Sequence, residues 1–279
     1  MAMLGKAIRM ARLVNQKSGK FMAITVDHSL SRGILKGLIP IQDTIDKIVA
    51  GRPDAMTMTK GIAESCWWKH AGSDVSLLLK CSNYSPVQPT SDVIFGSVEE
   101  GVRMGADAVS IGAMMLGDHQ GEQVREIGRF SQKCMELGMP LIGHIYPKGE
   151  SVAKADQTKW ENIAYCVRAG AELGVDIVKT TYTGSPDTMR KVVEAVPAAT
   201  RVVIQGGDAC KTLDDYLQMT REAMDCGVGG VTMGRFVFDY QDITALVVVL
   251  RKIIHEDYTV KEAKELLAQL ENDKNYADF

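Results

Sequence analysis

The chain has 279 residues, of which 46% are hydrophobic, so it can bury the core of one large α/β domain or of two small ones. Its formal net charge is −3 and it has no basic stripe interleaved with aromatic residues, which argues against nucleic acid as a partner. The longest apolar run, residues 245–250, is too short to cross a bilayer, and the N-terminus lacks the features of a signal peptide. The 6 cysteines are dispersed without a Cys-x-x-Cys pair, which indicates reduced thiols. We therefore expect a cytoplasmic protein that does not enter a membrane.

Strand-like and helix-like patterns alternate along the whole chain. An amphipathic helix is expected first, at residues 4–14. The expected strands are residues 21–26, 55–59, 75–79, 106–111, 140–145, 175–182, 201–205 and 230–233. Between them we expect helices at residues 40–50, 98–104, 120–137, 160–173, 189–195 and 213–226, and two more close the chain at residues 243–255 and 260–270. Residues 81–92, rich in Ser, Pro and Asn, are expected to form a loop.

Eight apolar strands, most of them followed by a helix, predict a (β/α)8 TIM barrel. We expect one domain, residues 1–279, with an extra helix at the N-terminus and another at the C-terminus. A doubly wound open sheet is the alternative, but eight successive units argue against it. No Gly-x-Gly-x-x-Gly follows the first strand, which also argues against a dinucleotide-binding fold.

The sixth strand carries a lysine among apolar residues. Alternate residues of a strand share a face, so Ile177, Lys179 and Thr181 point the same way. Burial and a nearby second cation lower the pKa of an amine, which can then attack a carbonyl as a nucleophile. The alternative is that Lys179 forms a buried ion pair with a carboxylate. Candidates for the second cation are Lys60, Lys80 and Lys148.

Ionisable groups follow other strands at the ends where a barrel gathers its catalytic residues. Ala23, Thr25 and Asp27 share one face of the first strand, and Tyr146 ends the fifth on the same face as His144. Asp27 and Tyr146 are therefore candidates for proton transfer. The two histidines at the mouth, His28 and His144, could bind substrate hydroxyls, and a structural role is equally open.

Glycines follow the last two strands, where barrels hold phosphate. Gly206 and Gly207 follow the seventh strand, and Gly234 and Arg235 follow the eighth. Glycine lets backbone amides approach phosphate oxygens closely, and arginine adds a bidentate donor. Either glycine site alone would indicate only a tight turn, but both together with an arginine favour a phosphorylated substrate.

The segments at the strand ends are specific only in combination. They are Asp27-His28, Tyr-Pro-Lys-Gly at residues 146–149, and residues 177–184, 206–207 and 230–235. With them the chain resembles the archaeal-type class I aldolases, a family that includes fructose-bisphosphate aldolase and 2-amino-3,7-dideoxy-D-threo-hept-6-ulosonate synthase. Residues 37–39, 103–111 and 139–142 are more similar to the synthase branch.

The resemblance implies roles for residues of the site. It implies Lys179 as the Schiff-base residue, Tyr146 as proton donor or acceptor and Asp27 as general base or orienter. His28 and Lys148 would then help to bind the substrate. The resemblance also implies a homo-oligomer, specifically a decamer.

The chain departs from the family pattern around the phosphate end. Ser29 replaces a glycine, Lys148 replaces an arginine, and residues 208–210 and 236–239 differ from the usual motifs. We therefore expect a class I aldolase or transaldolase acting on a ketose phosphate, without a cofactor. Acyl transfer to a thiol acceptor and a non-catalytic sugar-phosphate sensor are the alternatives. A metal-dependent aldolase is less favoured because none of the 5 histidines is paired at ligand spacing.

Overall fold

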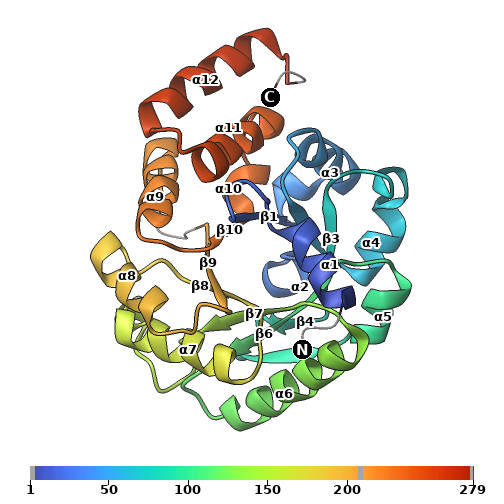
Figure 1. Cartoon of the computed structure of the whole chain (residues 1–279), viewed down its shortest axis with the longest axis vertical. Coiled ribbons are helices and arrows are strands. Elements are labelled where there is room, and N and C mark those ends of the chain that lie inside the picture. Colours follow the sequence, from blue (N-terminus) through green and yellow to red (C-terminus); the bar gives the residue numbers. More distant parts are fainter. Residues whose placement is uncertain (1–3, 207–209, 277–278) are drawn as a thin grey trace.

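The predicted TIM barrel is confirmed by the computed structural model, which describes residues 4–206, 210–276 and 279 (Figure 1). Eight parallel strands close in the order β1-β10-β9-β8-β7-β6-β3-β2. They are β1 (Phe21–Thr25), β2 (Ala55–Thr59), β3 (Ser76–Lys80), β6 (Ala108–Met114), β7 (Leu141–Tyr146), β8 (Ile177–Thr180), β9 (Arg201–Gln205) and β10 (Gly230–Met233). The expected domain limits, residues 1–279, stay a prediction.

Helices surround the barrel, and extra helices lie at both ends of the chain, as expected (Figure 1). They are α1 (Leu4–Leu13), α2 (Ser29–Arg32), α3 (Ile41–Ala50), α4 (Lys60–Cys66), α5 (Val98–Arg103), α6 (Gln120–Leu137), α7 (Trp160–Glu172), α8 (Pro186–Glu194), α9 (Leu213–Asp225), α10 (Arg235–Phe238), α11 (Ile243–Glu256) and α12 (Val260–Asp273). Local sequence sets several of their ends: Ser97, Thr212 and Thr259 form capping boxes at the starts of α5, α9 and α12. No helix in the described ranges is long and apolar enough to span a membrane.

The chain packs in two concentric layers. Ala23, Ile142 and Ile177 lie in the cluster that fills the barrel, whereas Met22 and Ile24 pack outward against the helices. The alternation of faces predicted for the first strand is therefore confirmed. Leu13, the last residue of α1, and Val14, which follows it, belong to the inner cluster, so the C-terminal end of α1 packs against the barrel interior.

The region expected to be a loop at residues 81–92 is instead part of an antiparallel hairpin, so that prediction was wrong. The hairpin consists of β4 (Ser82–Ser85) and β5 (Gln88–Ile94), and it follows β3 directly. The chain turns at residues 86–87 and then continues as β5. Successive residues of β5 alternate between two faces, with Thr90, Asp92 and Ile94 on one and Ser91 and Val93 on the other. The hairpin contacts β6 and α2, so it adds a wall to the open end of the barrel.

Candidate active site

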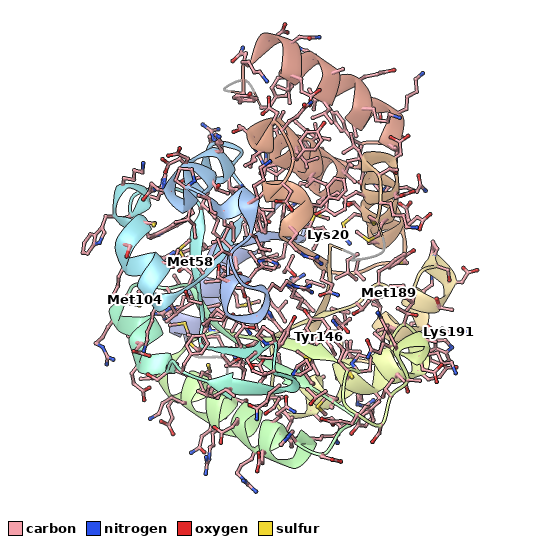
Figure 2. The ribbon with its side chains drawn as sticks, turned by 180° about the vertical axis from the view of Figure 1, so that it is seen from behind. Lys20, Met58, Met104, Tyr146, Met189 and Lys191 are labelled. Atoms are coloured by element: carbon pink, nitrogen blue, oxygen red, sulfur yellow. The ribbon has the colours of Figure 1, made fainter. Side chains whose placement is uncertain are left out.

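A pocket opens at the C-terminal ends of the barrel strands, where the sequence predicted it. It contains about 710 Å³ of empty space, including the part open to solvent. Tyr146, labelled in Figure 2, lies toward the middle of the barrel. The pocket is lined by Thr25, Asp27, His28, Ser31, Arg32, Lys80, Asn83, Tyr84, Asp92, Met114, His144, Tyr146, Lys148, Lys179, Gln205, Gly206, Thr232, Gly234 and Arg235.

Lys179 is the third residue of β8 and points into this pocket. Its side chain is only 7% exposed, and this burial is the main reason that its pKa falls from 10.5 to about 8. Lys80 and Lys148 lower the pKa of Lys179 further, whereas Asp27 raises it. Lys179 forms no ion pair with any carboxylate of the described residues, so the alternative of a buried ion pair is not supported. At neutral pH an appreciable fraction of this amine is uncharged.

Tyr146 ends β7, the strand next to β8. Its side chain is 7% exposed, and burial raises the pKa of its phenol well above the usual value. Asp27 and Asp92 raise the pKa further, because their negative charges oppose a phenolate. Tyr146 therefore stays protonated near neutral pH and can donate a proton.

Asp27 follows β1 and is held by the hairpin, because Asn83 Nδ2 donates a hydrogen bond of 2.9 Å to its backbone oxygen. Asp27 Oδ1 lies 3.6 Å from His28 Nδ1, too far for a hydrogen bond. Burial is the main cause that lowers the pKa of His28 to about 4, so the imidazole is neutral at pH 7. The rings of His28 and Phe238 pack edge to face, with 5.3 Å between their centroids.

The glycines that were predicted to bind phosphate follow β9 and β10, and β10 pairs with β1. Gly206, Gly234 and Arg235 all line the pocket, whereas Gly207 lies outside the described residues. A Cβ at Gly234 would overlap the His28 ring, so this position needs glycine. Burial and the nearby Arg32 lower the pKa of Arg235. Burial also lowers the pKa of Lys148, and the charges of Arg32 and Arg235 lower it further. The mouth of the pocket thus gathers positive charge, which suits an anionic substrate.

One candidate for the second cation is not at the site. Lys60 begins α4, and its Nζ donates hydrogen bonds to Glu100 Oε1 at 2.8 Å and to the backbone oxygen of Phe95 at 3.1 Å. It does not line the pocket, whereas Lys80 and Lys148 do. The expectation that Lys60 acts as a neighbouring cation is therefore wrong, and the other two lysines fill that role.

Several pocket residues had not been singled out from the sequence: Arg32, Asn83, Tyr84, Asp92 and Gln205. Three of them come from the hairpin. The only signal was the polar composition of residues 81–92, which does not show that the segment turns back over the barrel. Among the residues that the structure describes, no three His, Cys, Asp or Glu side chains gather as ligands for a metal ion.

Comparison with known proteins places the chain in a family. The model of the DeoC/LacD family aldolases matches residues 21–240. A 2-amino-3,7-dideoxy-D-threo-hept-6-ulosonate synthase of Halobacterium salinarum is 31% identical over 91% of this chain and 92% of its own length. A 2-amino-4,5-dihydroxy-6-oxo-7-(phosphonooxy)heptanoate synthase of Streptomyces griseus is 27% identical over 92% of this chain and 93% of its own length.

A solved structure of an aldolase is also similar to this chain. It is an archaeal fructose-1,6-bisphosphate aldolase whose catalytic lysine is covalently bound to the carbinolamine intermediate of the substrate. That protein is 25% identical, superposes with a TM-score of 0.80, and the match covers 90% of this chain and 99% of the other. The resemblance noted from the strand-end motifs is confirmed, and the chain belongs to the DeoC/LacD family of aldolases.

Proposed function

We propose that this protein is a class I aldolase or transaldolase that forms or cleaves a C–C bond of a ketose phosphate through an imine on Lys179. The observation that carries the proposal is the state of Lys179: a buried amine, with a pKa of about 8, that faces the same pocket as Tyr146 and Asp27. The lysine of the related aldolase structure that carries the carbinolamine supports the same chemistry.

The reaction begins when the neutral Lys179 amine attacks the ketone carbon and forms a carbinolamine. Tyr146, held protonated by its surroundings, donates a proton so that the hydroxyl leaves as water. The resulting iminium withdraws electrons from the adjacent carbon. In cleavage, Asp27 takes the proton of the hydroxyl two carbons beyond the iminium carbon, the C–C bond breaks, and an aldehyde leaves. Protonation of the enamine carbon followed by hydrolysis regenerates Lys179, and the reverse sequence forms the bond.

The substrate phosphate would bind at Gly206, Gly234 and Arg235, with His28 and Lys148 beside it. Gly207, outside the described residues, was expected to join them. Phosphate binding by itself would favour a charged lysine in the pocket. Surroundings that instead lower the pKa of Lys179 serve nucleophilic attack, which favours an enzyme over a sugar-phosphate sensor.

Reductive trapping tests the proposal directly. Incubation with dihydroxyacetone phosphate or fructose 1,6-bisphosphate and borohydride should add the reduced substrate to Lys179, as read by intact mass and peptide mapping. A Lys179→Met protein should carry no adduct, whereas Lys191→Met, which removes an exposed lysine of α8, should be labelled like the wild type. An adduct on another lysine, or none with either ketone, would contradict the proposal. Sedimentation of the same samples would test the homo-oligomer, a decamer by family resemblance, which stays a prediction.

A further inference from the structure

Buried polar groups with few or no hydrogen-bond partners among the described residues gather on the side of the pocket formed by β3, β6 and β7. His144 is 7% exposed, lines the pocket, and receives no hydrogen bond to its ring from any described residue. Asp92 Oδ1 is buried without a hydrogen-bond partner in the part of the chain that the structure describes, and so is the hydroxyl of Ser110, which lies deeper on β6. Lys80 is 3% exposed, and among the described residues the one hydrogen-bond partner of its Nζ is the Ser82 hydroxyl, at 3.4 Å. Buried polar groups are normally satisfied, so such a cluster marks a place that a polar group of a ligand occupies.

Gly112 lies at the centre of this cluster. It is the Cα partner of His144 on the neighbouring strand, and its N–H donates a hydrogen bond of 2.7 Å to Ser82 Oγ, the same atom that Lys80 contacts. A Cβ at position 112 would overlap the carboxylate of Asp92. The glycine therefore lets the hairpin bring Asp92 against β6, beside the strand that carries His144. Ser82 of the same hairpin contacts Lys80. We call Lys80, Asp92 and His144 together the β6 subsite.

The chemistry of the three side chains selects the group that they would bind. The Lys80 ammonium only donates hydrogen bonds, the Asp92 carboxylate only accepts them, and a neutral imidazole does one of each. His144 is neutral, because burial, followed by Lys80 and Lys179, lowers its pKa well below the usual value. A carboxylate or phosphate would be repelled by Asp92, and an ammonium by Lys80. A hydroxyl both donates and accepts, so it satisfies all three.

The pairing of the barrel strands indicates which hydroxyl of the substrate would reach the β6 subsite. His144 on β7 is also the Cα partner of Lys179 on β8, and adjacent strands lie ~4.8 Å apart. The phosphate end lies on the other side of β8, toward β9 and β10. Building on the imine proposed above, we propose that the β6 subsite, formed by Lys80, Asp92 and His144, binds the hydroxyl on the carbon next to the imine carbon, on the side away from the phosphate. The site thereby distinguishes hydroxylated ketose phosphates from their deoxy analogues.

Two ketones that differ only in this hydroxyl provide the test. Dihydroxyacetone phosphate has it, and hydroxyacetone phosphate has a methyl group in its place. The concentration of each ketone that gives half-maximal cyanoborohydride labelling of Lys179 is measured at fixed pH. The wild type should require about 10- to 100-fold less dihydroxyacetone phosphate than hydroxyacetone phosphate, as expected for a hydrogen bond to a charged group.

Variants of the β6 subsite test whether it causes the preference for dihydroxyacetone phosphate over hydroxyacetone phosphate. Asp92→Asn should remove most of this preference, because it should weaken labelling with dihydroxyacetone phosphate more than labelling with hydroxyacetone phosphate; the readout is the ratio of the two half-maximal concentrations, so an equal change in both labellings would not count. Val93→Ala, a change at an exposed position of the same strand, should keep the full preference. His144→Asn provides a second test that leaves the hairpin intact, and it should reduce the preference in the same direction. Thermal unfolding of each variant identifies any that fail to fold.

The outcomes separate the two proposals. Equal labelling by both ketones in the wild type, or a full preference retained in both Asp92→Asn and His144→Asn, would overturn the β6 subsite while leaving the imine on Lys179 intact. Failure of both ketones to label Lys179 would overturn the proposed function and the subsite with it.

Discussion

Lys148 Nζ lies 4.9 Å from the centre of the Tyr146 ring, two residues back along the chain. This arrangement is a cation–π contact, and it holds the lysine beside the proton donor that we propose. Lys148 is also one of the two lysines whose charge lowers the pKa of Lys179. Lys148 therefore contacts the ring of Tyr146 and also lowers the pKa of the proposed nucleophile, Lys179.

Removal of the Lys148 charge should shift the pH dependence of imine formation. The amine attacks only when unprotonated, so in the wild type the rate of reductive labelling should rise with pH and level off above a midpoint of about 8. In Lys148→Met the pKa of Lys179 rises, so the midpoint moves to higher pH and labelling at pH 7 becomes slower. Lys60→Met is the matched control, because Lys60 pairs with Glu100 outside the pocket, and its midpoint should not move. Midpoints shifted equally in both variants would contradict a local effect of Lys148.

Replacement of Tyr146 should separate imine formation from turnover. Tyr146→Phe keeps the ring under Lys148 but removes the proton donor, so we expect turnover to fall by ~10²- to 10⁴-fold. Dehydration of the carbinolamine would also slow, while prolonged labelling should still reach Lys179. Steady-state rates and intact mass measure the two effects. Tyr165→Phe, at an exposed site on α7, should behave as the wild type, and near-normal turnover in Tyr146→Phe would exclude this residue as the donor.

Strand periodicity predicted the residues that lie directly on the barrel strands or at their ends. Lys179, Tyr146 and Asp27 could be placed together because alternate residues of a strand share a face and the strand ends of a barrel meet. Lys60 could not be placed, because a strand that ends where a helix begins no longer fixes the direction of the side chain. Asp92 could not be found either, since its place depends on a hairpin folding back over β6, and on a glycine 20 residues later that leaves room for it.

The reaction that we propose needs no metal ion, because the iminium itself withdraws electrons from the reacting carbon. Dialysis against EDTA should therefore leave the rate of C–C cleavage within about twofold of the untreated enzyme, since the imine takes the place of a Lewis acid. The comparison requires the same protein measured before and after dialysis, with the metal content of both samples determined. Activity lost on dialysis and restored by Zn²⁺ would instead support a metal-dependent aldolase.

The buried amine should reduce the stability of the fold that holds it. A pKa lowered from 10.5 to about 8 means that the folded state binds the proton of Lys179 more weakly than the unfolded state does. The penalty is fully present below pH 8, at about 3 kcal/mol, and it disappears as the pH rises from about 8 to 10.5, so stability increases across this window.

Lys179→Met removes that penalty and keeps a side chain of similar length. We therefore expect its free energy of unfolding, from urea titrations at pH 7, to exceed that of the wild type by on the order of 1 to 3 kcal/mol. At pH 9.5 the gap should narrow, because the wild-type amine is then largely neutral in the folded state. Lys191→Met should show no such pH-dependent gap, since Lys191 is exposed. A Lys179→Met protein less stable than the wild type at pH 7 would mean that the lysine is held by favourable contacts, and that its amine is not the poorly solvated nucleophile on which the proposed imine depends.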